Sequence, residues 1–262
     1  MDRYVNHLYL QKEPPGGNYL QRLIQHHLLR IPYETISKFH YFVHGPQPIP
    51  AFSEFMDNLE HQHWGGTCFT LNINFARLLN ELGFQTNYVR VNPGHLGLMV
   101  TLEGRRYYVD VGYGSPIMKP VVLDQKKFQV LHGFGEEITF TQKDYDVFEI
   151  DRRSNGKSFV KKRIEWKPLT EAEISTDIDQ SYEDSADNQN MRRITAVKFQ
   201  GNTCYYLKNE SLKVMTYRNI REYQMRSYPK WRDAVQKVYG FQDEALEAAV
   251  KFLQDRDVTI FK

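Results

Sequence analysis

The chain has 262 residues, of which 41% are apolar and 25% charged, and its formal net charge is only +2. This length and composition indicate a globular protein with a sizeable core and exclude disorder as its main state. Because the basic residues are spread along the chain, nothing in the composition favours nucleic-acid binding, although a phosphorylated small molecule remains open as a ligand.

The sequence also bears on cellular location and on metal binding. No apolar run approaches the roughly 20 residues of a membrane-spanning helix, and the first residues are polar rather than a secretion signal, so we expect a cytoplasmic protein with no membrane partner. Two cysteines, Cys68 and Cys204, are too few for a disulfide framework and have no zinc-like spacing. His61 and His63 lack companion ligands, so no metal is expected.

The first third of the chain has helical periodicity. Apolar residues recur every three or four positions over 20–28, and a second, shorter helix is predicted over 52–59. The strongest pattern predicts a helix over 67–82, for which Thr67 is a suitable N-cap and Gly83 a suitable terminator. These segments predict a bundle of helices.

From residue 84 the apolar period changes to two, which indicates a sheet or small barrel. The predicted elements are strands over 88–91, 96–102, 107–111, 146–151 and 158–166, a short helix over 170–178, an exposed connection over 181–190, strands over 194–199 and 204–208, and helices over 231–239 and 243–254. Asn155-Gly156 is a strong hairpin turn between two of the strands.

Cys68 begins the strongest predicted helix and directly follows Gly65, Gly66 and Thr67. The unpaired N–H groups and the dipole of a helix N-terminus favour a thiolate there, which is what a nucleophilic cysteine needs. The alternative is a small buried residue with no chemistry. Cys204, in the middle of an apparent strand, is expected to be packed.

A base and an acid follow in the next hairpin. If Glu103 and Gly104 are its two turn residues, Gly97 faces Asp110, and His95 lies on the same face as Asp110 at a reachable diagonal. A cysteine nucleophile needs a base, and that base needs an acceptor on its other ring nitrogen, so the two residues could complete a triad. A loop histidine and a turn-capping aspartate are the simpler alternative.

The order of these motifs resembles that of the arylamine N-acetyltransferases. The resemblance is carried by Ile31-Pro32-Tyr33-Glu34, Gly65-Gly66-Thr67-Cys68-Phe69, His95 before a strand, and Val109-Asp110-Val111-Gly112-Tyr113-Gly114 with Pro116. It is strongest over 31–116, extends weakly to the C-terminus, and suggests a divergent member of the bacterial type. It implies an α+β, papain-like cysteine acyltransferase fold, with a helical domain (1–83), a central β-barrel (84–190) and an α/β lid (191–262).

The resemblance also implies a reaction. Acetyl-CoA would acylate Cys68, coenzyme A would leave, and an arylamine, hydrazine or N-hydroxyarylamine would take the acetyl group while His95, oriented by Asp110, moves the proton. A related amide synthase or transglutaminase-like hydrolase would use the same triad, and a homologue without activity would only bind coenzyme A.

Substrate contacts follow from the same resemblance and from the glycine-rich turns. Tyr113 and Phe69 are expected to line the acceptor pocket, although Tyr113 could instead pack beside its turn. Backbone N–H groups suited to a coenzyme A phosphate occur at Gly112, Gly114, Ser115, Gly201 and Thr203.

Three positions depart from the family pattern. Trp64 replaces the usual arginine before the two glycines, Thr67 replaces an aromatic residue, and Thr70 replaces an acidic one. In the family that arginine is expected to brace the catalytic loop, partly against the acidic residue matched by Glu34, so Glu34 must find another partner. Acyl transfer is expected from the retained triad, whereas the acceptor stays open.

Overall fold

The computed structural model describes residues 1–45 and 47–261, and its N-terminal part is helical. The elements are α1 (Asp2–His7), α2 (Gly17–Arg30), α3 (Ile36–His44), α4 (Phe52–His61) and α5 (Cys68–Glu81). The predicted helices over 20–28, 52–59 and 67–82 are thus confirmed. Nearly every side chain of α5 is buried, so this helix is the centre of the bundle rather than a surface helix with one apolar stripe.

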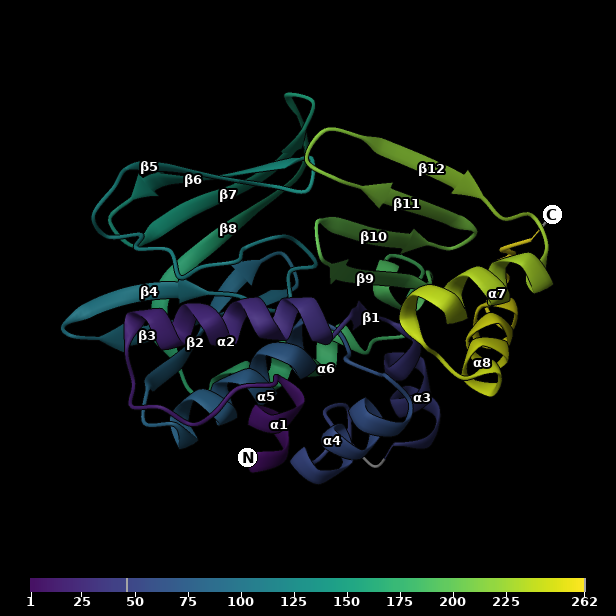
Figure 1. Cartoon of the computed structure of the whole chain (residues 1–262), viewed down its shortest axis with the longest axis horizontal. Coiled ribbons are helices and arrows are strands. Elements are labelled where there is room, and N and C mark those ends of the chain that lie inside the picture. Colours follow the sequence, from purple (N-terminus) through teal and green to yellow (C-terminus); the bar gives the residue numbers. More distant parts are fainter. Residues whose placement is uncertain (46, 262) are drawn as a thin grey trace.

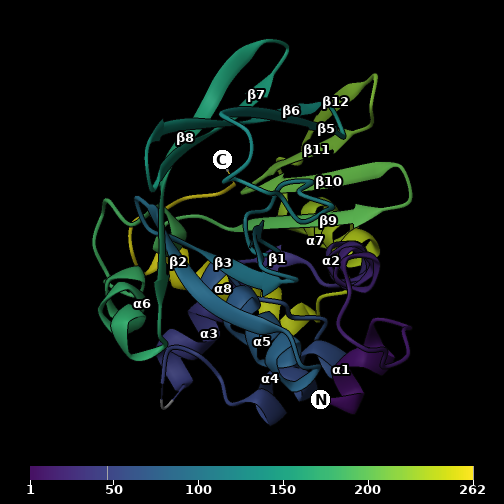
Figure 2. The same ribbon diagram turned by 90° about the vertical axis from the view of Figure 1, so that its left-hand side faces the viewer.

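The middle of the chain forms a curled antiparallel sheet of seven strands (Figures 1 and 2). Its strands are β2 (Gln85–Asn92), β3 (His95–Leu102), β4 (Arg105–Val109), β5 (Phe128–Gly133), β6 (Glu136–Asp144), β7 (Val147–Ser154) and β8 (Lys157–Leu169). Their order is β4-β3-β2-β8-β7-β6-β5, which leaves β4 and β5 as edges. The sheet is therefore a half-barrel, more open than the expected barrel.

A second antiparallel sheet has five strands and carries the C-terminal helices. It contains β1 (Tyr33–Glu34), β9 (Thr195–Gln200), β10 (Thr203–Lys208), β11 (Ser211–Met215) and β12 (Ile220–Gln224) in that order. The remaining helices are α6 (Ser175–Ser181), α7 (Tyr228–Tyr239) and α8 (Asp243–Gln254), and α7 and α8 lie beside this sheet at the right of Figure 1. Because β1 pairs with β9, the chain just before α3 is fixed against the C-terminal third.

The buried apolar side chains form three clusters. One surrounds α2 and α5, one fills the curled sheet around Tyr108 and Trp166, and one lies between the five-stranded sheet and the two last helices. Figure 2 shows β2 and β3 running alongside α5. Within the described part of the chain, helices long and apolar enough to span a bilayer are absent.

Candidate active site

Cys68 is the first residue of α5, and its side chain is only 3% exposed. Two glycines set its position. A Cβ on Gly65 would lie 1.9 Å from the carbonyl oxygen of Pro32, so only glycine lets this loop pass so close to the segment leading into β1. Gly66 has φ +115°, a conformation that L side chains rarely adopt. The chain therefore enters α5 through a close turn that holds the thiol at the helix N-terminus.

His95 begins β3, and Asp110 directly follows β4. The pairing of Leu98 with Val109 places Gly97 opposite Asp110, which is the register predicted from the Glu103-Gly104 turn. Asp110 Oδ2 lies 2.7 Å from His95 Nε2. The other ring nitrogen, Nδ1, is therefore not used by Asp110, and the charge of His95 lowers the pKa of the Cys68 thiol.

Asp110 is held by further donors that the sequence reasoning missed. Its Oδ2 accepts a hydrogen bond from Tyr108 Oη at 2.7 Å, and its Oδ1 accepts from Asn72 Nδ2 at 3.0 Å and from the Gly112 N–H at 2.9 Å. Asn72 lies one turn after Cys68 on α5 and also donates to the Leu96 carbonyl at 2.8 Å. It thereby ties the helix to the hairpin. A buried polar side chain in an apolar helix is the sequence signal that could have identified it.

The electrostatics of the three groups are coupled. Burial alone would raise the pKa of the Cys68 thiol, but the charge and hydrogen bond of His95, followed by the charge of Lys38, lower it below its ordinary value. Burial would lower the pKa of His95, yet Asp110 and Cys68 raise it to about 9. Burial would raise the pKa of Asp110, and the hydrogen-bonded His95 reverses this. The arrangement favours a thiolate, an imidazolium and a carboxylate.

Gly112 packs directly on the nucleophile position. A Cβ there would lie 2.7 Å from the Cys68 Cα and 2.8 Å from Asn72 Nδ2. We expect Gly112→Ala to cost about 1–3 kcal/mol of unfolding free energy by overpacking and to lower activity at least about tenfold by shifting the thiol. Gly17→Ala is the matched control, because its Cβ would meet no atom within 4 Å. Chemical denaturation and steady-state rates measure both effects, and a Gly112→Ala protein as stable and active as Gly17→Ala would contradict this packing.

The turn after Asp110 is bound inside the protein rather than open to solvent. The Gly112 N–H donates to Asp110 at 2.9 Å, while its expected role toward a phosphate stays a prediction. The carbonyls of Tyr113 and Gly114 accept hydrogen bonds of 3.1 and 3.0 Å from Arg152, which pairs with Glu136. This buried ion pair, not foreseen from the sequence, anchors the turn to the curled sheet.

The other residues expected to contact the substrates do not all lie in one place. The Tyr113 ring lies 4.7 Å from the His95 ring, centre to centre. Phe69 is buried in the core around α5. Ser115 is buried, whereas Gly201 and Thr203 lie at the turn between β9 and β10.

The structure shows the surroundings of Thr70 and Trp64, two of the departures from the family pattern, and the partner of Glu34. Glu34 is buried and accepts hydrogen bonds from the Ser37 hydroxyl at 2.5 Å and the Ser37 N–H at 2.8 Å, and burial raises the pKa of this carboxyl. Ser37 is thus the partner that replaces the missing arginine. Thr70 packs against Gly66, where a Cβ would lie 2.7 Å from the Thr70 Cβ. Trp64 packs against the rings of His40 and Tyr41 in α3.

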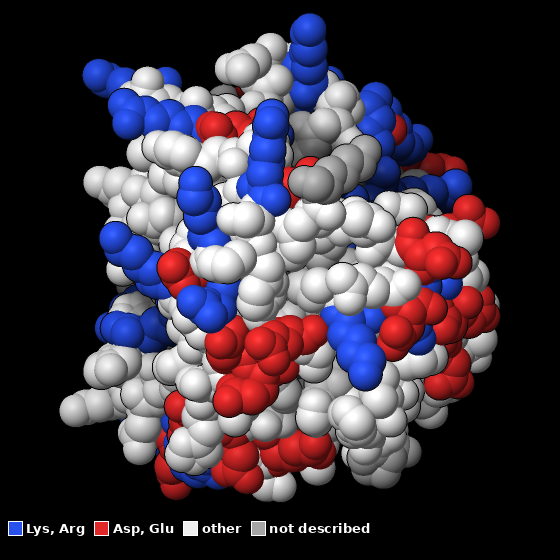
Figure 3. All heavy atoms as spheres, turned by 90° about the vertical axis from the view of Figure 1, so that its right-hand side faces the viewer, with Lys and Arg blue, Asp and Glu red and all other residues white. Residues whose placement is uncertain are grey.

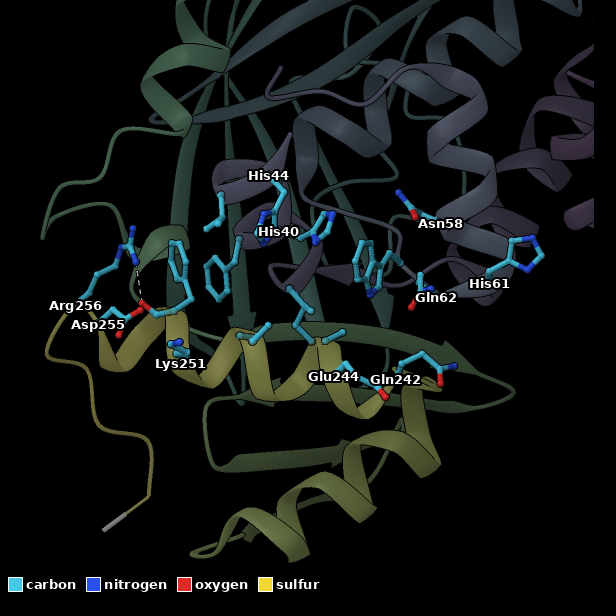
Figure 4. Close-up of a pocket in the computed structure, with 18 residues that line it drawn as sticks. His40, His44, Asn58, His61, Gln62, Gln242, Glu244, Lys251, Asp255 and Arg256 are labelled. Carbon is cyan, nitrogen blue, oxygen red and sulfur yellow. Dashed lines mark hydrogen bonds between the residues drawn. The ribbon is translucent and has the colours of Figure 1, made fainter. Parts of the chain in front are cut away.

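Trp64 instead lines a cleft between α3, α4 and α8 with a volume of about 990 Å³. Figure 4 shows His40 and His44 on one side and Glu244 and Lys251 of α8 on the other. The cleft does not include Cys68 among its lining residues.

Figure 3, which views the side of the molecule that bears α7 and α8, shows acidic and basic side chains on the same face, so it does not present a patch of one sign. Among the described side chains, no group of three or more metal-binding residues occurs.

Comparison with known proteins connects this geometry to a family. The profile of the N-acetyltransferase family matches residues 18–245. Human arylamine N-acetyltransferase 1 is 29% identical over 108 residues, which are 36% of this chain and 36% of that protein. Proansamycin X synthase of Amycolatopsis mediterranei is 30% identical over 128 residues, 41% of this chain and 48% of that enzyme. The matched stretch thus spans about a third to a half of these curated relatives.

Solved structures match over nearly the whole chain. The arylamine N-acetyltransferase of Mycobacterium marinum superposes with a TM-score of 0.81 and 15% identity, covering 100% of this chain and 99% of that one. The arylamine N-acetyltransferase of Bacillus cereus is described as having a Cys-His-Glu catalytic triad. It superposes with a TM-score of 0.75 and 15% identity, covering 92% of this chain and 98% of that one. These structures have the expected papain-like fold. Because the family profile covers most of this chain, the chain belongs to the arylamine N-acetyltransferase family.

Proposed function

We propose that the protein is an acetyl-CoA-dependent N-acetyltransferase that works by a ping-pong mechanism with Cys68 as nucleophile, His95 as base and Asp110 as the group that orients the base. The observation that carries this proposal is the position of His95, whose Nε2 lies 2.7 Å from Asp110 Oδ2 and whose charge lowers the pKa of the Cys68 thiol. Family membership supports acetyl transfer to an arylamine.

In the first half of the reaction, the Cys68 thiolate attacks the thioester carbonyl carbon of acetyl-CoA. The backbone N–H of Cys68 faces the oxyanion, because the first N–H groups of a helix have no partner within it. The tetrahedral intermediate collapses, the C–S bond to coenzyme A breaks, and the imidazolium of His95 returns a proton to the departing thiolate. An acetyl group is then held on Cys68.

In the second half, an amine attacks the carbonyl carbon of the acetyl-cysteine. His95, now neutral, removes the amine proton, the C–S bond to Cys68 breaks, and the amide leaves while the thiolate–imidazolium pair is restored. Because the thiol and imidazole are both almost fully buried, bulk water has little access to the acetyl-enzyme. This burial favours transfer over hydrolysis.

Substrate contacts are proposed on the same basis. The Tyr113 ring beside His95 would stack on an aromatic acceptor. The Tyr113 and Ser115 hydroxyls are buried without a hydrogen-bond partner among the described residues, so they are polar atoms that a bound substrate could satisfy. The proposed coenzyme A contacts are Gly112, Gly114, Ser115, Gly201 and Thr203. The reaction would take place in the cytoplasm, where thiols stay reduced.

A related amide synthase is the second candidate, because proansamycin X synthase is among the relatives. Initial rates measured at several fixed concentrations of acetyl-CoA and of an aromatic amine separate the possibilities. Ping-pong transfer predicts parallel double-reciprocal lines and release of free coenzyme A that depends on the amine. Release at the same rate without amine would indicate a hydrolase, and the absence of acetylated amine would overturn the proposal.

A further inference from the structure

Two histidines lie on one exposed face of α3. His40 and His44 are four residues apart, a spacing that makes side chains neighbours on the surface of a helix. Both side chains are exposed, and their ring centres lie 5.1 Å apart. Figure 4 shows them on the same side of the cleft between α3, α4 and α8. Both residues line this cleft and Cys68 does not, so the pair is separate from the acyl-transfer site.

The ring nitrogens of the pair are available to a ligand. The His40 ring contacts the rings of Trp64, His44 and Tyr41, with centres 4.9, 5.1 and 5.8 Å away. Among the described residues, neither histidine side chain takes part in a hydrogen bond or an ion pair. Burial, followed by the charge of His44, lowers the pKa of His40, so this ring is mainly neutral at pH 7. A neutral imidazole with an unused nitrogen lone pair is the form that binds a metal.

The separation of the two rings favours one coordination geometry. A Zn–N bond is about 2.0–2.1 Å long, so the centre of a bound imidazole lies about 3.2 Å from the ion. Two rings bound at the tetrahedral angle would then be about 5.2 Å apart, whereas the right angle of a square-planar or octahedral ion would bring them to about 4.5 Å. The observed 5.1 Å agrees with the tetrahedral arrangement that zinc prefers.

We propose that His40 and His44 together bind a Zn²⁺ ion on the surface of α3. No group of three or more metal-binding side chains occurs among the described residues, so water would take the other two positions of the tetrahedron. His61 also lines the cleft, but Figure 4 shows it at the far end. Since His44 is the last residue of α3, the ion would join the last two turns of this helix and stabilise its C-terminal end.

Isothermal titration with Zn²⁺ tests this site. Untagged protein carrying Cys68→Ala is the parent, so that zinc held by the catalytic thiol is not counted. The parent should bind one zinc ion. Adding His40→Gln or His44→Gln should weaken the binding at least about tenfold, because each change removes one of two ligands. His61→Gln serves as the control, since it removes an exposed histidine from the same cleft, and it should leave the affinity unchanged.

Trp64 provides a second readout. Its ring lies 4.9 Å from that of His40, so an ion held by His40 is close to the indole. Co²⁺, which can replace zinc and quenches indole fluorescence, should lower the emission of the parent. Trp64→Phe should lose most of this quenching, because Trp166 in β8 and Trp231 in α7 do not line the cleft. The quenching should be absent from the His44→Gln variant as well.

Three results would overturn the zinc site. The first is a parent protein that shows no saturable zinc binding. The second is unchanged affinity in His44→Gln, a variant that leaves the contact between His40 and Trp64 in place. The third is binding that is lost in His61→Gln and kept in the other two variants, which would place the ion at the other end of the cleft.

Discussion

Asp110→Asn is expected to lower kcat/KM for acetyl transfer by about a thousandfold to ten-thousandfold while the protein still folds. The carboxylate accepts hydrogen bonds from four groups, among them His95 and Tyr108. In asparagine, an amide nitrogen would replace one of the two carboxylate oxygens. Because this nitrogen donates and cannot accept, it would face the N–H or O–H groups that now donate to that oxygen. His95 would then lose the tautomer and orientation that direct Nδ1 at the thiol, and the imidazolium would lose its counter-charge.

Tyr108→Phe is the matched control for this change. It removes one hydrogen bond to the same carboxylate and leaves the charge in place, so a reduction of less than about tenfold is expected. Steady-state kinetics and circular dichroism of both variants decide the result. Asp110→Asn activity within tenfold of the wild type would show that the carboxylate does not orient the base.

His95→Gln should abolish the reactivity of Cys68 at neutral pH. In the wild type, His95 is the largest of the influences that outweigh burial and hold the pKa of the thiol below its ordinary value. Without the imidazolium, burial would raise that pKa, and the thiolate fraction at pH 7 would fall by about a hundredfold or more. Alkylation of the wild type should therefore continue to lower pH than that of a free cysteine, whereas the variant should react only as the pH becomes alkaline.

Alkylation rates by iodoacetamide from pH 5 to 10, followed by mass, measure this difference. Cys204 is an internal control, because it is buried and burial raises the pKa of its thiol. Cys68→Ala should consequently incorporate no label over the same period. Coincident pH profiles for the wild type and His95→Gln would contradict a thiolate–imidazolium pair.

The sequence could predict those parts of the site that depend on short-range geometry. The two-residue Glu103-Gly104 turn fixes the register of β3 and β4, and that register alone brings His95 and Asp110 together. Cys68 was likewise placed by local signals, because two glycines and a helix start are adjacent in the chain. Asn72, by contrast, contacts residues 24 and 38 positions away, and such pairings follow from packing rather than from periodicity.

Three strands that the sequence analysis did not predict lack the pattern on which such a prediction depends. β1 is only two residues long, and β12 is exposed along its whole length, so neither has an alternation of apolar and polar side chains. β5 also lacks clean alternation and is an edge strand, so no pattern predicts it, and the barrel was expected from the family resemblance. The connection over 181–190 is exposed over most of its length, as predicted, and Tyr182 is its buried residue, beside Lys38.

The intact mass of the protein after brief exposure to acetyl-CoA tests the central claim most directly. Wild-type protein should gain one acetyl group and lose it when an aromatic amine or hydrazine is added, while Cys68→Ala should gain none. An adduct of the same size on Cys68→Ala would place the acetyl group elsewhere. No adduct on the wild type, with coenzyme A neither bound nor released, would contradict acyl transfer through Cys68.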